Sequence, residues 1–243
     1  MKFLTISSSL ILYPLVYCQN TPITRDSSFL FTQNFDTNDP SERNLETVRS
    51  MLSVLLEGNT RDNLDPRDVA NSLIKNYGCY CWPDGRKVVQ SKFQYSGPGL
   101  DEIDKLCRTL YIKQKCLTID ARNGVYNGND CPASNKFKWY VDESLPLGSS
   151  DTQKIVCGDE SDPTYYGRKS CKMTNCELER EFAIGVYELY VNQNFEINSD
   201  YRNMSDEEYK NACPSSKVIS DSAPDRSLGC CGQGTSRRPY NLI

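Results

Sequence analysis

Apolar residues recur at spacings of three and four in four stretches of the chain, which is the period of an amphipathic helix. The first stretch covers residues 42–57 and is followed by Gly58, a residue that favours the end of a helix. The second opens with Asp65 and Pro66, because aspartate is a frequent N-cap and proline is tolerated in the first turn. It is expected to end at residues 77–78.

The third and fourth stretches predict helices over residues 100–114 and 176–193. Residues 78–99 contain glycine, proline and cysteine and are interpreted as a loop. Asparagine, glycine, aspartate and proline are frequent from 117 to 175, so we expect loops there with a small β-hairpin. The pattern predicts a mainly α fold with extended loops.

The two ends of the chain differ from this helical part. Residues 1–18 contain one lysine, a short apolar run and small residues before Gln19, which predicts a secretory signal peptide. Residues 19–40 are polar and predict a disordered leader or propeptide. We assign residues 41–195 to a helical domain and 196–243 to a cysteine-containing C-terminal extension. A secreted, extracellular protein is expected.

Cysteine content agrees with export. The chain has 12 cysteines, and Cys18 lies in the predicted signal, which leaves an odd number. After a signal peptide such cysteines predict disulfides rather than zinc ligands, and an odd one predicts a free thiol or a disulfide-linked oligomer. Asn203 opens an Asn-Met-Ser sequon, so we expect a glycoprotein. The net charge of −4 provides no basic excess for a nucleic-acid partner.

The chain contains no histidine. Serine and cysteine triads, a histidine general base and histidine-based zinc sites are therefore excluded. The remaining acid–base candidates are carboxylates, among them Asp101 and Asp104 on one side of the third helix and Glu179 on the fourth. The simpler interpretation of the aspartates is a solvated acidic first turn that favours the helix dipole. Residues 120–130 lack the spacing of a calcium loop and are interpreted as a turn-rich connection.

Three segments taken together resemble the secreted phospholipase A2 superfamily. They are NYGCYCWPDG (76–85), LDEIDKLC (100–107) and CELEREFA (176–183). The family has a YGCYC-plus-glycine loop that binds calcium, then D-x-x-D-R-C-C-x-x-H-D on one long helix and C-x-C-D-R on an antiparallel one. The resemblance covers residues 65–195. It implies a disulfide-stapled phospholipase A2-like fold with two long antiparallel helices and a small β-hairpin.

The resemblance also implies a disulfide pattern. Two family bridges between the long helices are lost as whole pairs, because their positions fall on Leu106 with Gly185 and on Lys113 with Leu178. The retained family bridges map onto Cys81–Cys107, Cys131–Cys171 and Cys157–Cys176. The other disulfide candidates are Cys79, Cys116, Cys213, Cys230 and Cys231, so we expect at least one bridge from the tail to the domain.

The catalytic positions of the resembled family are not retained. Its histidine falls on Leu110 and its calcium-binding aspartate on Tyr111. Glu179 matches the residue that would orient the histidine. Trp82 and Pro83 stand where the calcium loop has glycine. The resemblance without these groups implies a pseudoenzyme with no catalytic residue, no metal and no cofactor, and calcium stays open only for the calcium-dependent alternative.

The leading hypothesis is a secreted, non-catalytic phospholipase A2-like protein that acts as an extracellular binding or matrix component. The tail CCGQGTSRRPYN also resembles a C-C-G-x-x-P-x-R-x-P-Y motif of extracellular matrix and mucin-like proteins of aquatic invertebrates and protists. One alternative is a calcium-dependent phospholipase A2 or other lipid-active enzyme that uses a base such as Asp104 or Glu179. Another is a lipid-binding or toxin-like module. The extracellular protein or lipid partner is not identified by the sequence.

Overall fold

The computed structural model describes residues 40–82, 99–126, 137–144, 153–158, 170–213, 228–232 and 238–241. The predicted signal peptide and almost all of the predicted leader lie outside the described residues, as do Pro83 and Cys131. The first described residue is Pro40, at the start of a helix.

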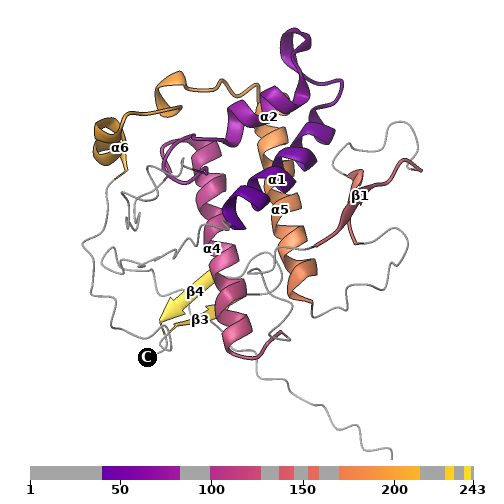
Figure 1. Cartoon of the computed structure of the whole chain (residues 1–243), viewed down its shortest axis with the longest axis vertical. Helices are drawn as coiled ribbons and strands as arrows, with labels where there is room; N and C mark the ends of the chain where they lie inside the picture. The colour runs from indigo at the N-terminus through magenta and orange to yellow at the C-terminus, as the bar shows by residue number, and fades with distance from the viewer. Residues whose placement is uncertain are drawn as a thin grey trace, which may run out of the picture.

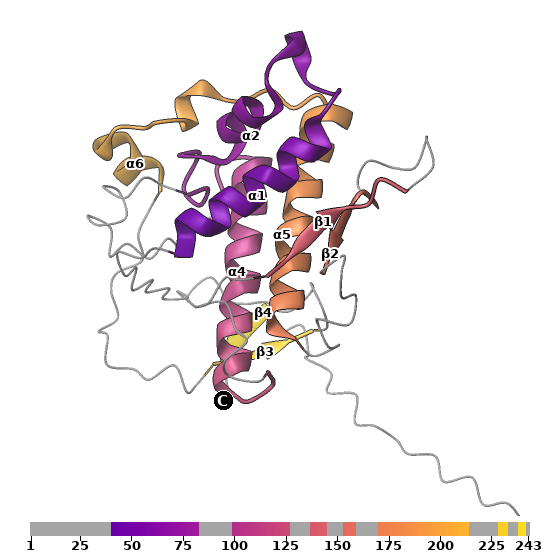
Figure 2. The ribbon, with the colours of Figure 1, turned by 45° about the vertical axis from the view of Figure 1, so that its right-hand side comes forward.

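Two long helices form the centre of the structure (Figures 1 and 2). They are α4 (Glu102–Arg122) and α5 (Cys171–Tyr187). Leu106 in the first half of α4 meets Gly185 near the end of α5, whereas Gln114 reaches back to Asn175 near its start. The two helices are therefore antiparallel. The prediction of a mainly α protein with two long helices is confirmed.

Helices α1 (Pro40–Leu56) and α2 (Pro66–Ile74) cover this pair, and α1 crosses it in both views (Figures 1 and 2). Their inward faces are fully buried at Met51, Leu52, Leu55, Leu56, Leu73 and Ile74. Each such side chain contributes roughly 1.5–3 kcal/mol by leaving water, so this apolar stripe is what fixes the two helices on the core. Asp65 caps α2 as predicted, accepting from the backbone N–H groups of the next turn.

Helix α4 is two turns longer than the predicted helix, which ended at 114. Cys116, Leu117 and Ile119 are buried and continue the apolar face, because the helical period persists through a stretch that also contains polar residues. The helix ends at Arg122 and is followed by Asn123 and Gly124, which has φ 74°. The prediction of loop from 117 onward is wrong for this part, and residues 120–122 belong to the helix.

Other helix boundaries also differ from the prediction. Helix α2 ends at Ile74 and not at residues 77–78, and α4 begins at Glu102 and not at residue 100. Helix α5 begins at Cys171, five residues before the predicted start, because Ser170 accepts a hydrogen bond from the N–H of Met173 and caps it. It continues into a π-helical turn (Glu188–Asn192). Helix α1 begins at Pro40 rather than 42, so the predicted leader overlaps it by one residue.

The expected hairpin within 117–175 is present. Strand β1 (Trp139–Val141) pairs antiparallel with β2 (Ile155–Cys157), Tyr140 lying opposite Val156. A second hairpin, β3 (Leu228–Cys231) with β4 (Arg238–Asn241), packs on α4. The tail also contains a 3-10 turn (Ser199–Tyr201) and α6 (Asp206–Ala212). These tail elements were not predicted.

Four disulfides are seen among the described cysteines: Cys79–Cys213, Cys81–Cys107, Cys116–Cys230 and Cys157–Cys176. Two of them hold the tail on the domain, one at the loop after α2 and one at α4, in agreement with the expected bridge from the tail. None of the described helices is both long enough and apolar enough to cross a membrane.

Candidate functional site

The positions that correspond to the catalytic pair of the resembled family lie in the middle of α4. Leu110 is buried in the main core with 4% of its surface exposed. Tyr111 beside it is half-buried, and burial raises the pKa of its phenol, with a smaller contribution from Tyr80. A leucine side chain and a neutral phenol therefore occupy these positions. Neither group is a base that could deprotonate water at neutral pH.

Glu179 lies on the face of α5 that is turned towards α4 and is completely buried. One carboxyl oxygen accepts long hydrogen bonds of 3.4 Å from the side-chain amides of Gln114 and Asn175. The other oxygen has no hydrogen-bond partner among the described residues. Burial raises the pKa of Glu179 well above its usual value, and the bond from Asn175 only partly opposes this. The hydrogen bonds of Glu179 are made to the side-chain amides of Gln114 and Asn175.

Asp101 forms the N-cap of α4, accepting from the backbone N–H of Asp104 at 2.9 Å. Its other carboxyl oxygen accepts a short hydrogen bond from the hydroxyl of Tyr77. That hydroxyl in turn accepts from the backbone N–H of Asn198 at 3.3 Å. Asp101 thus joins the start of α4 to the loop after α2 and to the tail.

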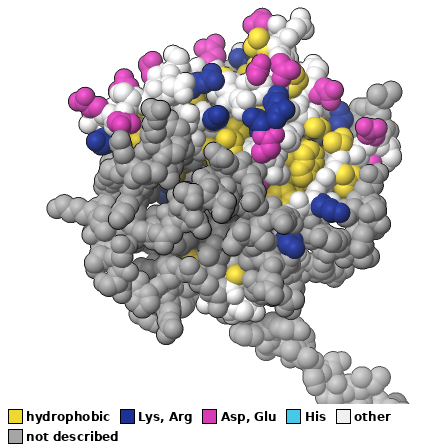
Figure 3. All heavy atoms as spheres, viewed as in Figure 1, with side chains coloured by type: hydrophobic (Ala, Val, Ile, Leu, Met, Phe, Trp, Pro, Cys, Tyr) yellow, Lys and Arg dark blue, Asp and Glu magenta, His cyan; other side chains and the backbone are white. Residues whose placement is uncertain are grey.

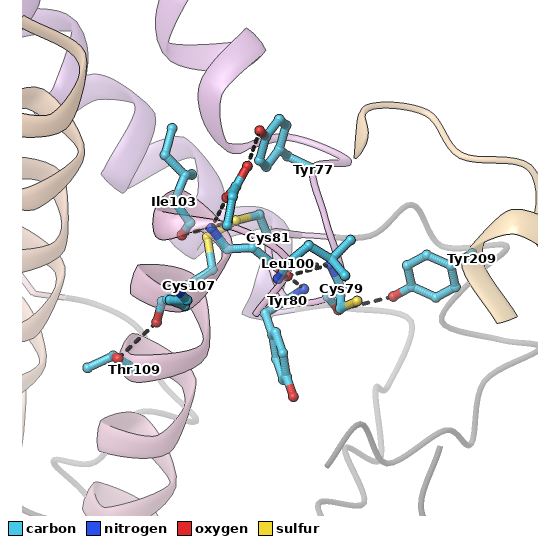
Figure 4. Close-up of a disulfide and its surroundings, with 12 residues drawn as sticks. Tyr77, Cys79, Tyr80, Cys81, Leu100, Ile103, Cys107, Thr109 and Tyr209 are labelled. Carbon is cyan, nitrogen blue, oxygen red and sulfur yellow. Dashed lines mark hydrogen bonds between the residues drawn. A yellow bond between two sulfur atoms is a disulfide. The ribbon is translucent and has the colours of Figure 1, made fainter. Parts of the chain in front are cut away.

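Asp104 is completely buried, so the prediction that both aspartates are solvated is wrong for this residue. Its carboxylate accepts from the backbone N–H groups of Cys79, Tyr80 and Leu100 at 2.8–3.0 Å. Burial raises the pKa of Asp104, although these hydrogen bonds oppose the shift. Figure 4 shows the surrounding loop, in which the Cys81–Cys107 disulfide ties the same segment to α4.

Two glycines allow this loop to approach the carboxylate. A Cβ on Gly78, which has φ 61°, would lie 2.4 Å from the side chain of Asp104. A Cβ on Gly99 would lie 2.5 Å from the backbone nitrogen of Lys105. Contacts under about 3 Å between such atoms are not tolerated, so both positions require glycine. The Y-G-C segment is therefore shaped around Asp104.

The two helix faces also meet at the positions where the resembled family has an interhelical disulfide. A Cβ on Gly185 would lie 3.2 Å from Leu106. Leu106 therefore packs directly on the α5 backbone at Gly185. At Lys113, the first position of the other family pair, the side chain forms an ion pair with Glu181 on α5, at 2.8 Å. Cys81–Cys107 and Cys157–Cys176 are the pairings that the resemblance implied.

Other predicted residues have mixed outcomes. Cys171 is buried and disulfide-bonded, but the expected pairing with Cys131 lies outside the described residues. The side chain of Cys231 is likewise not among those described. Trp82 packs edge-on against Phe182 of α5 with ring centroids 5.7 Å apart. Asn203 of the sequon is exposed, as an acceptor of a glycan must be.

The carboxyl groups of this region make structural contacts. Both carboxyl groups that could replace a histidine base, Asp104 and Glu179, have no exposed surface. Within the described ranges, no group of three or more cysteine, aspartate and glutamate side chains is placed to hold a metal ion. The sequence did not single out Tyr77, which contacts Asp101, or Gln114 and Asn175, which contact Glu179. The positions of these residues in the sequence do not predict the contacts, because the contacts of Tyr77 and Gln114 join residues 24 or more apart. Only the pair Asn175–Glu179 lies within one helix.

Comparisons of the chain with protein-family models, with curated proteins and with solved structures give no match.

Proposed function

We propose that the chain is a secreted, catalytically inactive phospholipase A2-like protein that acts as an extracellular binding or matrix component. The observation that carries the proposal is the burial of Leu110 in the core at the position of the family's histidine. Tyr111 takes the position of the calcium-binding aspartate and offers no carboxylate. Without a base, water is not activated, and without that carboxylate calcium has no side-chain ligand there.

Three features support the fold part of the proposal. The Y-G-C loop closes on Asp104 through the backbone N–H groups of Cys79 and Tyr80, and disulfides join Cys81 to Cys107 and Cys157 to Cys176. Leu106 faces Gly185 where a family bridge would lie. An antiparallel helix pair is by itself a common arrangement and can form without these contacts. The contacts therefore support the fold assignment more specifically than the helix pair does.

A disulfide-engineering experiment tests this correspondence. The double variant Leu106→Cys/Gly185→Cys is expected to form a bridge, because a Cβ at position 185 would lie 3.2 Å from a terminal methyl group of Leu106, so the two positions face each other across the helix pair. Peptide mapping by mass spectrometry would identify it. The matched control is Leu106→Cys/Ile184→Cys, whose second position lies on a neighbouring part of the α5 surface and should keep free thiols. Bridging in the control but not in the first variant would contradict the correspondence.

An activity assay tests the inactive part. Purified chain incubated with phospholipid vesicles is expected to release no fatty acid, with or without calcium. Calcium-dependent release that follows the protein through purification would contradict the proposal. The variant Glu179→Gln then separates the enzyme alternatives, because release that depends on Glu179 as a base would be lost in this variant and release through another base would not.

Lipid binding without hydrolysis is the second candidate. Apolar side chains gather on the surface between α5 and β1 (Figure 3), and all three residues of β1, Trp139 to Val141, are only half-buried. Aromatic side chains at a surface are suited to a lipid interface. Co-sedimentation with neutral vesicles that is lost in Trp139→Ala would favour this candidate over a matrix component.

A further inference from the structure

The sequon Asn203-Met204-Ser205 lies directly before α6, and the structure holds its three residues in different ways. The side chain of Asn203 is exposed, while its backbone N–H donates to the carbonyl of Asn76 at 3.1 Å. Met204 is buried, with 6% of its surface exposed. The asparagine can therefore carry a glycan in the folded chain, but the rest of the sequon is part of the packed structure.

The hydroxyl of Ser205 is engaged by the capping box at the start of α6. It donates to a carboxylate oxygen of Glu208 at 2.7 Å and accepts from the backbone N–H of that residue at 3.3 Å. The same carboxylate accepts from the backbone N–H of Ser205 at 2.8 Å. An enzyme that glycosylates a sequon must bind the serine hydroxyl as well as the asparagine amide. In the folded chain, Ser205 would first have to separate from Glu208.

Helix α6 is too short to persist by itself. It has 7 residues, whereas isolated helices shorter than about 12–15 residues are marginal in water. Tyr209 and Cys213 of this segment are buried against Cys79. The Tyr209 hydroxyl also donates to the backbone carbonyl of Cys79 at 3.1 Å (Figure 4). Because the Cys79–Cys213 disulfide makes this contact covalent, it is the bond that keeps the sequon in its folded state.

We propose that Asn203 is glycosylated only before the Cys79–Cys213 disulfide closes, so that closure of this bond ends the period in which the sequon can be modified. In the transfer, the side-chain nitrogen of Asn203 forms a bond to C1 of a sugar and loses a proton. The bond from C1 to the diphosphate of a lipid-linked oligosaccharide donor breaks, and the diphosphate leaves with the electron pair. Closure of the disulfide oxidises two thiols, and their two electrons and two protons reduce the disulfide of an oxidoreductase.

The order of synthesis leaves a limited period for the transfer. Cys213 follows Asn203 by ten residues, so the two are synthesised within about 0.5–2 s of each other at roughly 5–20 residues per second. Disulfide formation then takes on the order of seconds to hours. The period available to the transferase is therefore set mainly by how quickly Cys213 pairs with Cys79. The inference adds a regulated modification to the proposed function, and it rests on that function only for the export of the chain.

The test uses the full chain from a bacterial host without N-glycosylation, refolded with a disulfide isomerase, so that it does not depend on export. The chain is incubated with detergent-solubilised microsomes, which supply the transferase and the lipid-linked donor. Peptide mass spectrometry then measures the occupied fraction of Asn203. The oxidised chain is expected to stay unmodified, whereas the same chain with its disulfides reduced and alkylated is expected to be modified.

Variants identify which bond holds the sequon. Cys79→Ala/Cys213→Ala should raise the occupied fraction of Asn203 at least about tenfold over that of the oxidised chain, because a disulfide that closes a long loop strongly restricts local opening. Cys157→Ala/Cys176→Ala is the matched control. It removes a bridge between β2 and α5 and should leave the occupied fraction unchanged. A thermal melt and mapping of the remaining disulfides check that both variants are folded.

A second pair of variants examines the capping box. Added to Cys79→Ala/Cys213→Ala, the change Glu208→Ala should increase the rate of modification severalfold, because the hydroxyl of Ser205 would no longer be bound. Glu207→Ala, at the exposed neighbouring position of α6 and outside the capping box, should leave the rate unchanged.

Three results would overturn the proposal. They are modification of the oxidised chain as fast as of the reduced chain, modification of neither, and a rise in Cys157→Ala/Cys176→Ala as large as in Cys79→Ala/Cys213→Ala. None of them bears on phospholipid hydrolysis. Conversely, calcium-dependent hydrolysis would overturn the proposed function and leave the order of these two reactions unaffected, so the two failures can be told apart.

Discussion

Two carboxyl groups on the paired long helices are completely buried, but their surroundings differ. Asp104 accepts hydrogen bonds from three backbone N–H groups, at 2.8–3.0 Å. Glu179 accepts two long ones on one oxygen, and its other oxygen has no partner within the described residues. The first carboxylate organises a loop, and the second is a polar group enclosed in an apolar core. Burial alone therefore does not show what a carboxyl group contributes to stability.

This difference between Asp104 and Glu179 is what we expect if the chain is, as proposed, a protein that has kept a fold after the loss of its catalytic residues. A carboxylate that shapes the backbone remains necessary for folding, because its removal leaves several N–H groups without an acceptor. A carboxyl group that once had a catalytic neighbour loses its main contact when that neighbour is replaced. On this interpretation Asp104 is essential to the fold and Glu179 is tolerated at some cost.

The largest effect is expected from Asp104→Ala. The N–H groups of Cys79, Tyr80 and Leu100 would lose their acceptor, so the free energy of unfolding should fall by about 4 kcal/mol. Asp104→Asn should cost less, because one oxygen remains to accept. Urea denaturation with the disulfides intact measures both. If Asp104→Ala lost less free energy of unfolding than Asp104→Asn, the organising role of the carboxylate would be contradicted.

Gly78→Ala should have the next largest effect and lower the free energy of unfolding by about 3 kcal/mol. The new Cβ would meet Asp104, and the alanine would have to adopt a positive φ. Gly124→Ala provides the matched control. Gly124 has φ 74° but nothing within 4 Å of its Cβ position, so it should lose only about 1 kcal/mol. The difference between the two variants isolates the steric contact with Asp104. Equal losses would mean that only backbone conformation matters at position 78.

Glu179→Gln should stabilise the protein at neutral pH, on the order of 1 kcal/mol, since glutamine has nearly the shape of the protonated acid and cannot ionise. The folded state raises the pKa of Glu179, so it binds this proton more tightly than the unfolded state does. The stability contributed by the proton is present at pH below the unfolded pKa of about 4.3 and is lost as the pH rises towards the folded pKa.

The advantage of Glu179→Gln should therefore be near zero in acid and grow with pH. Denaturation curves of both proteins at acidic, neutral and mildly alkaline pH measure the difference. Asp104, whose pKa is also raised, is common to both proteins and cancels. If the difference in free energy of unfolding between the two proteins became smaller as the pH rises, Glu179 would be ionised in the core. The same would follow if Glu179→Gln were less stable than the unchanged protein at neutral pH.

The smallest effect is expected at the ion pair between Lys113 of α4 and Glu181 of α5. Lys113 is largely covered, while Glu181 is half-exposed. Lys113→Met, which keeps the apolar stem, should lose about 0.5 kcal/mol, and the loss should shrink at high salt. Thermal melts at low and high salt check this. A salt-independent loss would point to packing rather than charge.

Much of the fold could be predicted because local signals were strong. Asp65 and Pro66 fixed the start of α2, and the apolar period located all four long stretches. The end of α4 was missed because Lys115, Thr118 and Asp120 weaken the pattern, although Gly124 marks the stop. The tail elements were missed because α6 depends on the capping box of Ser205 and Glu208 and is held in place by a distant cysteine.

The candidate site was predictable in its residue types and not in its contacts. The absence of histidine and the identity of residues 110 and 111 are visible in the sequence. The burial of Asp104 is not, because it results from a loop more than 20 residues earlier folding over the helix.

The connection between Cys79 and Cys213 has a consequence for biosynthesis. The Cys81–Cys107 pair spans 26 residues, whereas Cys79 must wait for a partner 134 residues later. At synthesis rates of roughly 5–20 residues per second, that delay is on the order of 10 seconds. During this interval an unpaired thiol stands two residues from Cys81, in an oxidising compartment if the chain is exported. Correct pairing then depends on a disulfide isomerase, and yield in a host that lacks one should be limited by mispaired chains.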